Sequence, residues 1–425
     1  MTSTQAETLF LALAVVLALA RLLGAAARAI GQPAVLGEIL SGILIGPTFF
    51  HGNLAKHLLP TAVLPYLGSL AVLGLAIFMF LTGYELEHAL LRSQGRTAIG
   101  VAVSAFVLPF GLGVLLAFHL ADGHHLQSRT GFVLFLGAAM AVTAFPVLAR
   151  ILADRNMMQT RIGGISLASA ATSDLLAWLL LAIVVVVAGG PAQWRLALVP
   201  VYLAVLIGAV RPALRRILRA APDGADAALT SGAVAAVLGG LMLSCWATEW
   251  MGLHYIFGAF VFGAALPRGG TEQLRSDGIV DSLRNLGVVF LLPIFFVTAG
   301  LKVDLSHLGS RGLIDLVLIL LTAVTGKAVG AFAAARALRM PTREAGILAT
   351  LLNTRGLTEL VILSVGLQLG VLDQELYSLM VVMAVVTTFM AGPILRVLYP
   401  DAQIELDRTA AAAVRTKQPA TAAAR

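Results

Sequence analysis

Long runs of apolar residues, separated by short polar stretches, dominate the chain from residue 7 to residue 399. Most of these runs approach the ~20 residues that a helix needs to cross a hydrocarbon core. The composition agrees, because 59% of the residues are apolar, 12% are charged and the mean hydropathy is +0.92. The pattern therefore predicts an all-α polytopic membrane protein. We expect about thirteen transmembrane helices, over residues 7–24, 33–50, 65–86, 97–118, 129–153, 161–188, 195–210, 227–248, 252–266, 279–301, 312–336, 344–369 and 375–399.

The basic residues alternate with these spans. Counted together with the adjoining ends of the spans, the C-terminal tail and the loops after odd-numbered helices hold 22 Lys and Arg residues, whereas the N-terminus and the loops after even-numbered helices hold 5. By the positive-inside rule, the N-terminus lies outside and the C-terminus lies in the cytoplasm. Since topology itself requires basic loops, the net charge of +7 does not call for a nucleic-acid partner. The alanine-rich residues 400–425 are expected to form a disordered cytoplasmic tail.

Two pairs of segments resemble each other at a displacement of seven helices. Residues 77–87 match residues 294–304, and the span 129–153 matches the span 344–369. An odd displacement means that related segments cross the bilayer in opposite directions, which is typical of the inverted repeats of secondary transporters. We infer two inverted six-helix repeats, helices 1–6 and 8–13, joined by the helix over residues 195–210.

The fifth and twelfth predicted helices are both interrupted at mid-depth. The fifth contains Thr143 and then Pro146, which removes a backbone donor and clashes with the preceding turn. The twelfth contains the polar, glycine-bearing stretch 353–356. Two broken helices that cross near the midplane leave helix ends and free carbonyls facing a cavity, which can bind a small ion. The alternative is a plain proline kink in one span and a packing glycine in the other.

One acid lies near the middle of the sixth predicted span. Asp174 is about thirteen residues into the span 161–188, a depth of roughly 20 Å. A charge at the bilayer centre costs about 2.5 to 3.5 kcal/mol, so such a residue is by default a group for ion or proton handling. A monovalent cation is hard and prefers oxygen ligands. We predict that Asp174, Ser173 and Thr143 bind H⁺ and a monovalent metal cation, Na⁺ or K⁺, with the metal held at Asp174 and Ser173.

Further ionisable residues reach a similar depth on the last helices. Arg355 and Glu359 are four residues apart and share a helix face, so they are expected to pair and to compensate the exposed helix ends. Lys327 has no acid within reach on its own helix face, and we expect a partner from a neighbouring helix. With Asn353 and Thr354, these three residues are predicted to support the core and balance its charge.

Two other transport classes use an intramembrane acid. A proton-coupled exporter of an organic cation or drug would need a wider, aromatic-lined cavity, whereas Asp174 is surrounded by Ser and Ala. A gated cation channel does not explain why a lysine and an arginine share the depth of Asp174. No nucleophile constellation or phosphate-binding loop stands out, so neither an enzyme nor a cofactor is predicted.

Five ordered motifs resemble a known family. They are residues 31–47 (GQPAVLGEILSGILIGP), 80–86 (FLTGYEL), 143–150 (TAFPVLAR), 172–174 (TSD) and 353–360 (NTRGLTEL). Together they resemble the monovalent cation/proton antiporter-2 family, and most closely its branch of plant cation/proton exchangers. The resemblance runs from about residue 7 to residue 399.

The resemblance implies an elevator-type antiporter, usually a homodimer embedded in membrane lipid. It implies a dimerisation part over about 7–90 and 227–301, and a moving core over about 95–188 and 312–399. Family members carry the ion-binding acid at the position of Asp174 and a core lysine at the position of Lys327. Electrogenic relatives have two adjacent acids, whereas this chain has Ser173 before Asp174, which suggests electroneutral 1:1 exchange. Resemblance to the plant branch favours K⁺, with Na⁺ accepted.

Overall fold

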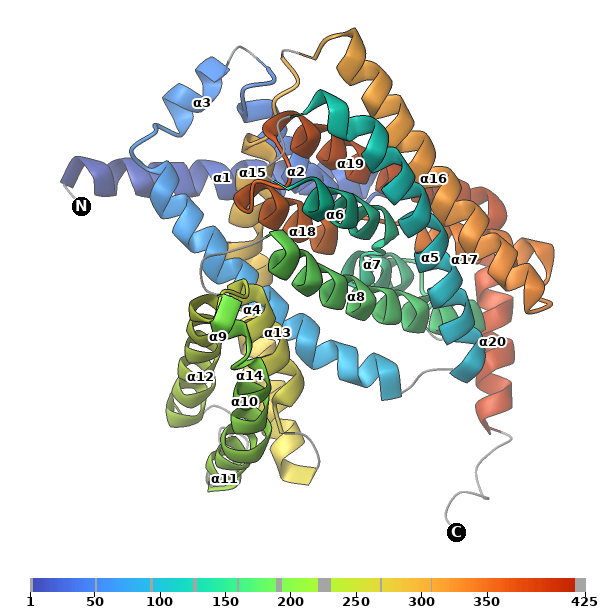
Figure 1. Ribbon diagram of the computed structural model, residues 1–425. Coiled ribbons are helices and arrows are strands. Elements are labelled where there is room, and N and C mark those ends of the chain that lie inside the picture. Colours follow the sequence, from blue (N-terminus) through green and yellow to red (C-terminus); the bar gives the residue numbers. More distant parts are fainter. Residues whose placement is uncertain are drawn as a thin grey trace. The chain divides into compact units, whose positions relative to one another are not determined.

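The structure is a computed structural model and is built of helices throughout the residues it describes (Figure 1). Within the described residues, ten helices are long and apolar enough to cross a membrane, and three shorter apolar helices cover Ala34–Ile45, Tyr255–Ala265 and Thr358–Gln368. The predicted all-α multi-pass membrane fold is confirmed. Each predicted span has a helical counterpart, while the number and direction of the crossings stay predictions, as do the inverted repeats. The described residues are 3–49, 52–91, 95–124, 128–158, 160–188, 193–220, 231–267, 270–306 and 308–416.

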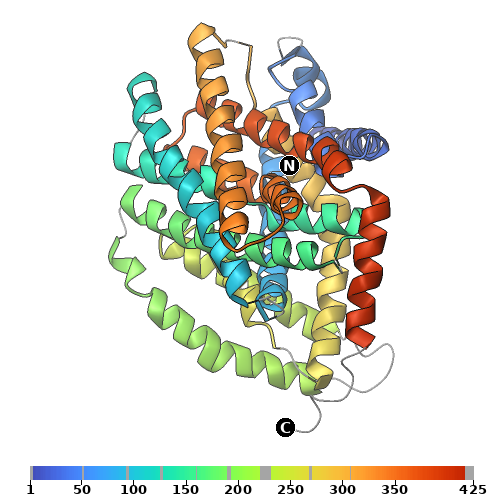
Figure 2. The same cartoon turned by 90° about the vertical axis from the view of Figure 1, so that its right-hand side faces the viewer.

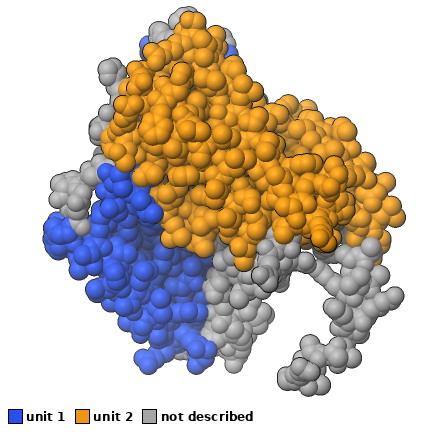
Figure 3. Space-filling model, turned by 45° about the vertical axis from the view of Figure 1, so that its right-hand side comes forward, with its two compact units in different colours: residues 1–25, 37–88, 182–306 blue, residues 26–36, 89–181, 307–425 orange. Residues whose placement is uncertain are grey.

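The chain divides into two compact units, coloured separately in Figure 3. Unit 1 comprises residues 1–25, 37–88 and 182–306, and unit 2 comprises residues 26–36, 89–181 and 307–425. Both units are therefore assembled from segments that lie far apart in the sequence.

Unit 1 is held together by small-residue contacts and by polar links between helices. A Cβ on Gly42 would lie 2.2 Å from the carbonyl oxygen of Val297, so only glycine permits this helix approach. Tyr84 donates a hydrogen bond to Asp277 at 2.5 Å, and Arg284 pairs with Glu85 at 2.5 Å. The helices lying mainly in this unit are α1 (Ser3–Ala29), α2 (Ala34–Ile45), α3 (Asn53–Leu58), α4 (Leu64–Leu91), α9 (Gln193–Leu196), α10 (Val199–Val205), α11 (Arg211–Ala220), α12 (Ser231–Trp250), α13 (Tyr255–Ala265), α14 (Gly270–Leu286) and α15 (Leu292–Leu301), with π-helical turns at Leu206–Val210 and Gly287–Leu291.

Unit 2 carries all the predicted site residues. Ser128 and Asp373 cap their helices, accepting hydrogen bonds from the amides of Gly131 at 3.1 Å and Leu376 at 2.8 Å. Helices α5 and α16 run side by side in both ribbon views (Figures 1 and 2). The helices lying mainly in this unit are α5 (Gly95–Leu120), α6 (Arg129–Ala141), α7 (Phe145–Asp154), α8 (Arg161–Ala188), α16 (Ser310–Ala337), α17 (Thr342–Leu352), α18 (Leu357–Gln368), α19 (Gln374–Leu398) and α20 (Asp401–Thr416), with a 3-10 turn at Ala121–Gly123.

The segment after the last predicted span differs from its prediction. Disorder is predicted for residues 400–425, but Asp401–Thr416 forms α20, and residues 417–425 lie outside the described residues. Alanine is the best helix former, which favours this structure in an alanine-rich segment. Ile404 is also buried, and Tyr399 donates a hydrogen bond to Asp407 at 2.5 Å. These contacts anchor the start of α20.

Candidate functional site

The two predicted helix interruptions are present in unit 2. The fifth predicted span is α6 followed by α7, separated by extended residues 142–144, and the twelfth is α17 followed by α18. The amide of Ala144 donates a hydrogen bond to the carbonyl of Thr354 at 3.2 Å, so the two unwound segments meet. Gly356 begins α18 with φ of +152°, a conformation that residues with a Cβ rarely adopt. This glycine therefore fixes the second break.

Asp174 lies on α8 and is fully buried. Its Oδ2 accepts a hydrogen bond from the amide of Phe145 at 3.3 Å and a long one from the Thr358 hydroxyl at 3.5 Å. Phe145 is the first residue of α7, where the amides have no acceptor within the helix and the helix dipole favours negative charge. Asp174 thus caps α7 from a neighbouring helix.

The other carboxylate oxygen of Asp174 is available. Among the described residues, Oδ1 of Asp174 is buried and has no hydrogen-bond partner, and the same holds for the hydroxyl of the adjacent Ser173. No ion pair within 4.0 Å joins Asp174 to a basic side chain in that part of the chain. The acid therefore keeps an open oxygen that can take a proton or a cation.

Lys327 on α16 is fully buried and contacts the end of α6. Its ammonium donates hydrogen bonds to the carbonyl of Ala141 and to the Thr143 hydroxyl, the latter at 2.6 Å. The sequence predicts an acid as the direct partner of Lys327, but the partner is a helix C-terminus, whose dipole favours a cation. The Thr143 hydroxyl also donates to the carbonyl of Leu352 at 3.1 Å, so its bonds hold the crossing together. Thr143 as an ion ligand stays a prediction.

Arg355 and Glu359 form a buried pair, as their spacing predicts. Nη1 of Arg355 lies 2.8 Å from Oε2 of Glu359, and both side chains are fully buried. The same guanidinium donates to the carbonyls of Ala139 and Met140, each at 2.7 Å. Arg355 thereby neutralises both an acid and the last carbonyls of α6.

The remaining predicted residues line the second break. The Thr354 hydroxyl donates to the carbonyl of Leu351 at 2.7 Å, and Asn353 caps the end of α17. The Oδ1 of Asn353 is buried without a partner among the described residues. Asn353 and Thr354 thus lie at the crossing, whereas no hydrogen bond links either one to Asp174 in the described part of the chain.

Two further hydroxyl residues at the site are not among the predicted ones. Thr358 lies in the first turn of α18 and reaches Asp174, a position that follows from its place two residues after the helix-breaking Gly356. Thr388 on α19 accepts from the amide of Arg355 at 2.9 Å and donates to the Arg355 carbonyl at 2.5 Å. Nothing in the sequence around Thr388 points to this contact, because it depends on how α19 packs against the break.

The sequence matches a family of known transport proteins. The family model described as the sodium/hydrogen exchanger transmembrane region matches residues 14–399. The chain belongs to this sodium/hydrogen exchanger family. The family resemblance predicted from the five motifs is therefore confirmed at the level of cation/proton antiporters.

Curated relatives of the chain are cation/proton antiporters by name. The Na(+)/H(+) antiporter NhaS4 of Synechocystis sp. is 37% identical, over 93% of this chain and 98% of that protein. Cation/H(+) antiporter 20 of Arabidopsis thaliana is 36% identical, over 92% of this chain and 48% of that protein. The K(+)/H(+) antiporter 1 of Saccharomyces cerevisiae is 29% identical, over 87% of this chain and 44% of that protein. The chain thus spans about half the length of these plant and yeast relatives.

A solved structure shares the fold. The sodium proton antiporter MjNhaP1 from Methanocaldococcus jannaschii at pH 8 matches with a TM-score of 0.57 at 16% identity. The match covers 95% of this chain and 99% of that chain. At this identity the likeness establishes the fold alone.

Proposed function

We propose that the protein is a monovalent cation/proton antiporter that exchanges Na⁺ or K⁺ for H⁺ at Asp174. The observation that carries the proposal is that only one of the two carboxylate oxygens of Asp174 is hydrogen-bonded among the described residues. One oxygen of Asp174 caps α7, and the other is buried with no partner among the described residues. The printed names of the relatives, a Na(+)/H(+) antiporter and a K(+)/H(+) antiporter, support the same cargo class.

Exchange follows from competition for this carboxylate. A proton and a cation both bind the ionised form of Asp174, so the presence of one excludes the other. The Ser173 hydroxyl is the nearest candidate for a second oxygen ligand. Because an empty, charged Asp174 is costly to move through a low-dielectric environment, the carrier returns only when loaded.

Lys327, Arg355 and Glu359 serve a different purpose in this proposal. With Asp174 they form a set of two cations and two anions, all fully buried. The two cations contact the C-terminal carbonyls of α6, and Asp174 contacts the first amide of α7. These residues hold the broken helices crossed, and the site carries the same net charge whether Asp174 binds a proton or a monovalent cation.

The proposal also includes a movement of the whole transport domain. Unit 2 carries the site and moves as an elevator-type transport domain, while unit 1 forms the interface of a homodimer in the lipid bilayer. The distribution of Lys and Arg supports an orientation with the N-terminus outside and the C-terminus in the cytoplasm.

The cargo class is tested in sealed proteoliposomes loaded with a pH-sensitive dye and given an inside-acidic gradient. We expect Na⁺ or K⁺, added outside as chloride, to dissipate the gradient within seconds, whereas an organic cation that does not cross the bilayer by itself, such as choline, leaves it intact. With an exporter of organic cations, the pH gradient would persist after the alkali ions are added. A channel would respond only when an electrical driving force is imposed.

The stoichiometry gives a second prediction. With one buried carboxylate at the exchange position and Ser173 beside it, each cycle moves one cation against one proton, and no net charge crosses the membrane. We expect the initial exchange rate to be the same with and without an imposed membrane potential set by valinomycin and a K⁺ gradient, measured with Na⁺ as the cargo. A rate that changes severalfold with the potential would contradict electroneutral exchange.

A further inference from the structure

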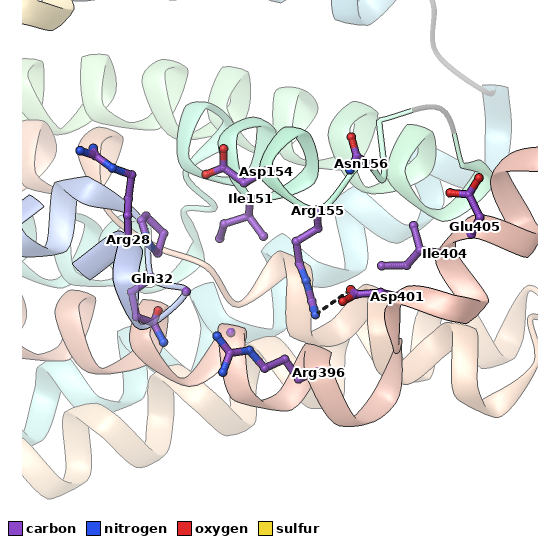
Figure 4. A pocket seen from close by; sticks show the side chains of 13 residues that line it. Arg28, Gln32, Ile151, Asp154, Arg155, Asn156, Arg396, Asp401, Ile404 and Glu405 are labelled. Carbon is purple, nitrogen blue, oxygen red and sulfur yellow. Dashed lines mark ion pairs between the residues drawn. The ribbon is translucent and has the colours of Figure 1, made fainter. Parts of the chain in front are cut away.

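A cavity of about 550 Å³ lies in unit 2 at the end of α7 that is remote from Asp174 (Figure 4). Since α7 runs from Phe145 to Asp154, the cavity and the acid are about 13 Å apart along its axis. Four segments contribute to its wall, namely the turn after α1, the end of α7, the end of α19 and the start of α20. The residues that the argument uses are Arg28, Ile151, Arg155, Arg396, Asp401 and Ile404.

Arg155 is the central basic group of this cavity. It follows α7, which ends in a turn with Asn156 at φ of +55°, a typical helix-ending position. The side chain of Arg155 is only 18% exposed, and its Nη2 lies 3.6 Å from Asp401. Its Nη1 is buried and has no hydrogen-bond partner among the described residues. One donor of this cavity-lining guanidinium therefore has no acceptor among the described residues.

A second guanidinium faces the same space. Arg396 on α19 donates to the carbonyl of Ile30 at 3.0 Å and lies across Gly31, where a Cβ would come within 1.9 Å of its Nη2. Burial lowers the pKa of Arg155, Asp401 opposes this, and the charge of Arg396 lowers the pKa further. Arg155 and Arg396 thus line one cavity, and Arg28 adds a third positive charge to the lining.

The lining also holds three acids, Asp154, Asp401 and Glu405, and the first two of them compensate the arginines only weakly. Asp154 is already paired with Arg150 at 3.0 Å. Asp401 is 91% exposed, and an ion pair of 3.6 Å at such a position contributes little stability. Asp401 can therefore be displaced by a better anion.

We propose that this cavity binds a phosphate group, carried either by the headgroup of a phospholipid or by a free phosphate compound. Two neighbouring guanidinium groups with a spare donor match the oxygens of a phosphate, which arginine binds in a planar, bidentate manner. The volume is in the range of ligand sites and leaves room for more than a phosphate ion. Ile151 and Ile404 supply an apolar surface for the remainder of the molecule.

The position of the cavity allows a bound ligand to influence the transport site through α7. A phosphate held between Arg155 and Arg396 would brace the end of α7 against α19, and the beginning of α7 is the element that Asp174 caps. Because a helix of ten residues moves as a rigid element, bound phosphate would restrict the motion of the Phe145 amide at Asp174.

The test measures binding to the purified full-length protein in neutral detergent by its melting temperature. Titrations use inorganic phosphate, phosphatidylglycerol in mixed micelles and, as the lipid reference, phosphatidylcholine. We expect a saturable rise in melting temperature with phosphate or with phosphatidylglycerol, and an apparent affinity weaker by about tenfold for each arginine removed in Arg155→Gln/Arg396→Gln. A response to phosphate identifies a free compound as the source, and a response to phosphatidylglycerol alone identifies a lipid headgroup.

A matched control removes the same charge elsewhere. Arg161→Gln/Arg343→Gln changes two arginines that do not line the cavity, and it should keep the wild-type affinity. Asp401→Asn removes the competing carboxylate and should raise the affinity severalfold, an outcome that misfolding cannot produce. The proposal is overturned if the wild type responds to neither ligand, if both double variants respond equally, or if Asp401→Asn leaves the affinity unchanged. None of these readouts requires exchange activity.

Discussion

Asp174→Asn is expected to abolish exchange while the protein still folds and inserts. The amide is nearly isosteric with the carboxylate, and its oxygen can still accept the hydrogen bond of Phe145 that caps α7. It cannot bind a proton in the physiological range or neutralise a cation. In the proteoliposome assay, dissipation of the pH gradient by Na⁺ or K⁺ should fall to the rate of protein-free vesicles.

A matched substitution separates this effect from any general loss of negative charge. Asp122→Asn makes the same chemical change at a side chain that is 71% exposed and pairs only weakly with Arg129, at 3.2 Å. We expect near-normal exchange for Asp122→Asn and the same membrane yield for both variants. Retained exchange in Asp174→Asn would remove the assignment of this acid as the carrier of both cargoes.

Arg355→Met is expected to cause the largest loss of stability. It leaves Glu359 buried without its partner and removes the donors to the carbonyls of Ala139 and Met140. Removing one member of a buried ion pair costs about 3 to 5 kcal/mol, because the other charge stays uncompensated. The melting temperature and the yield of monodisperse protein in detergent should both fall clearly below those of the wild type.

A second substitution identifies the origin of that loss. Glu359→Gln in the Arg355→Met background neutralises the stranded acid, so the double variant should be more stable than Arg355→Met alone. It should not reach the wild type, since two carbonyls at the end of α6 still lack their donors. As the control, Arg129→Met changes an arginine that is 63% exposed and should leave the melting temperature nearly unaffected. A double variant no more stable than the single one would show that the pair contributes little.

The fold could be predicted well because the membrane imposes strong constraints. Apolar stretches and the alternation of basic loops identify the helices, and Pro146 and Gly356 mark the two breaks by local backbone chemistry alone. Helix lengths are less predictable. The span expected at 195–210 continues in the structure to Arg219 through a π-helical turn, because a window of apolar residues does not register the basic, amphipathic turns that follow. The helix at Asp401–Thr416 escapes prediction for a related reason, since its burial depends on contacts with Tyr399 and the end of α19.

The sequence predicts which residues form the site better than it predicts the hydrogen bonds that they make. Burial of charge is costly, so Asp174, Lys327, Arg355 and Glu359 stand out by their position within apolar stretches of the sequence. The groups that these side chains contact cannot be identified in the sequence. Asp174, Lys327 and Arg355 contact backbone groups of other helices. The carbonyl that Lys327 contacts and the amide that donates to Asp174 are brought to these side chains only by the crossing of the broken helices.

The asymmetry of the Asp174 carboxylate bears on how fast the carrier can work. In the proposed exchange, one oxygen of Asp174 is held by the start of α7, so an arriving cation meets the single remaining oxygen and is bound in a monodentate manner. Such a cation has one bond to the carboxylate to break on leaving, whereas the bidentate carboxylate of a calcium loop has two, so we expect faster release. A transporter must release its cation in every cycle, and weaker attachment of the cation to Asp174 favours that release.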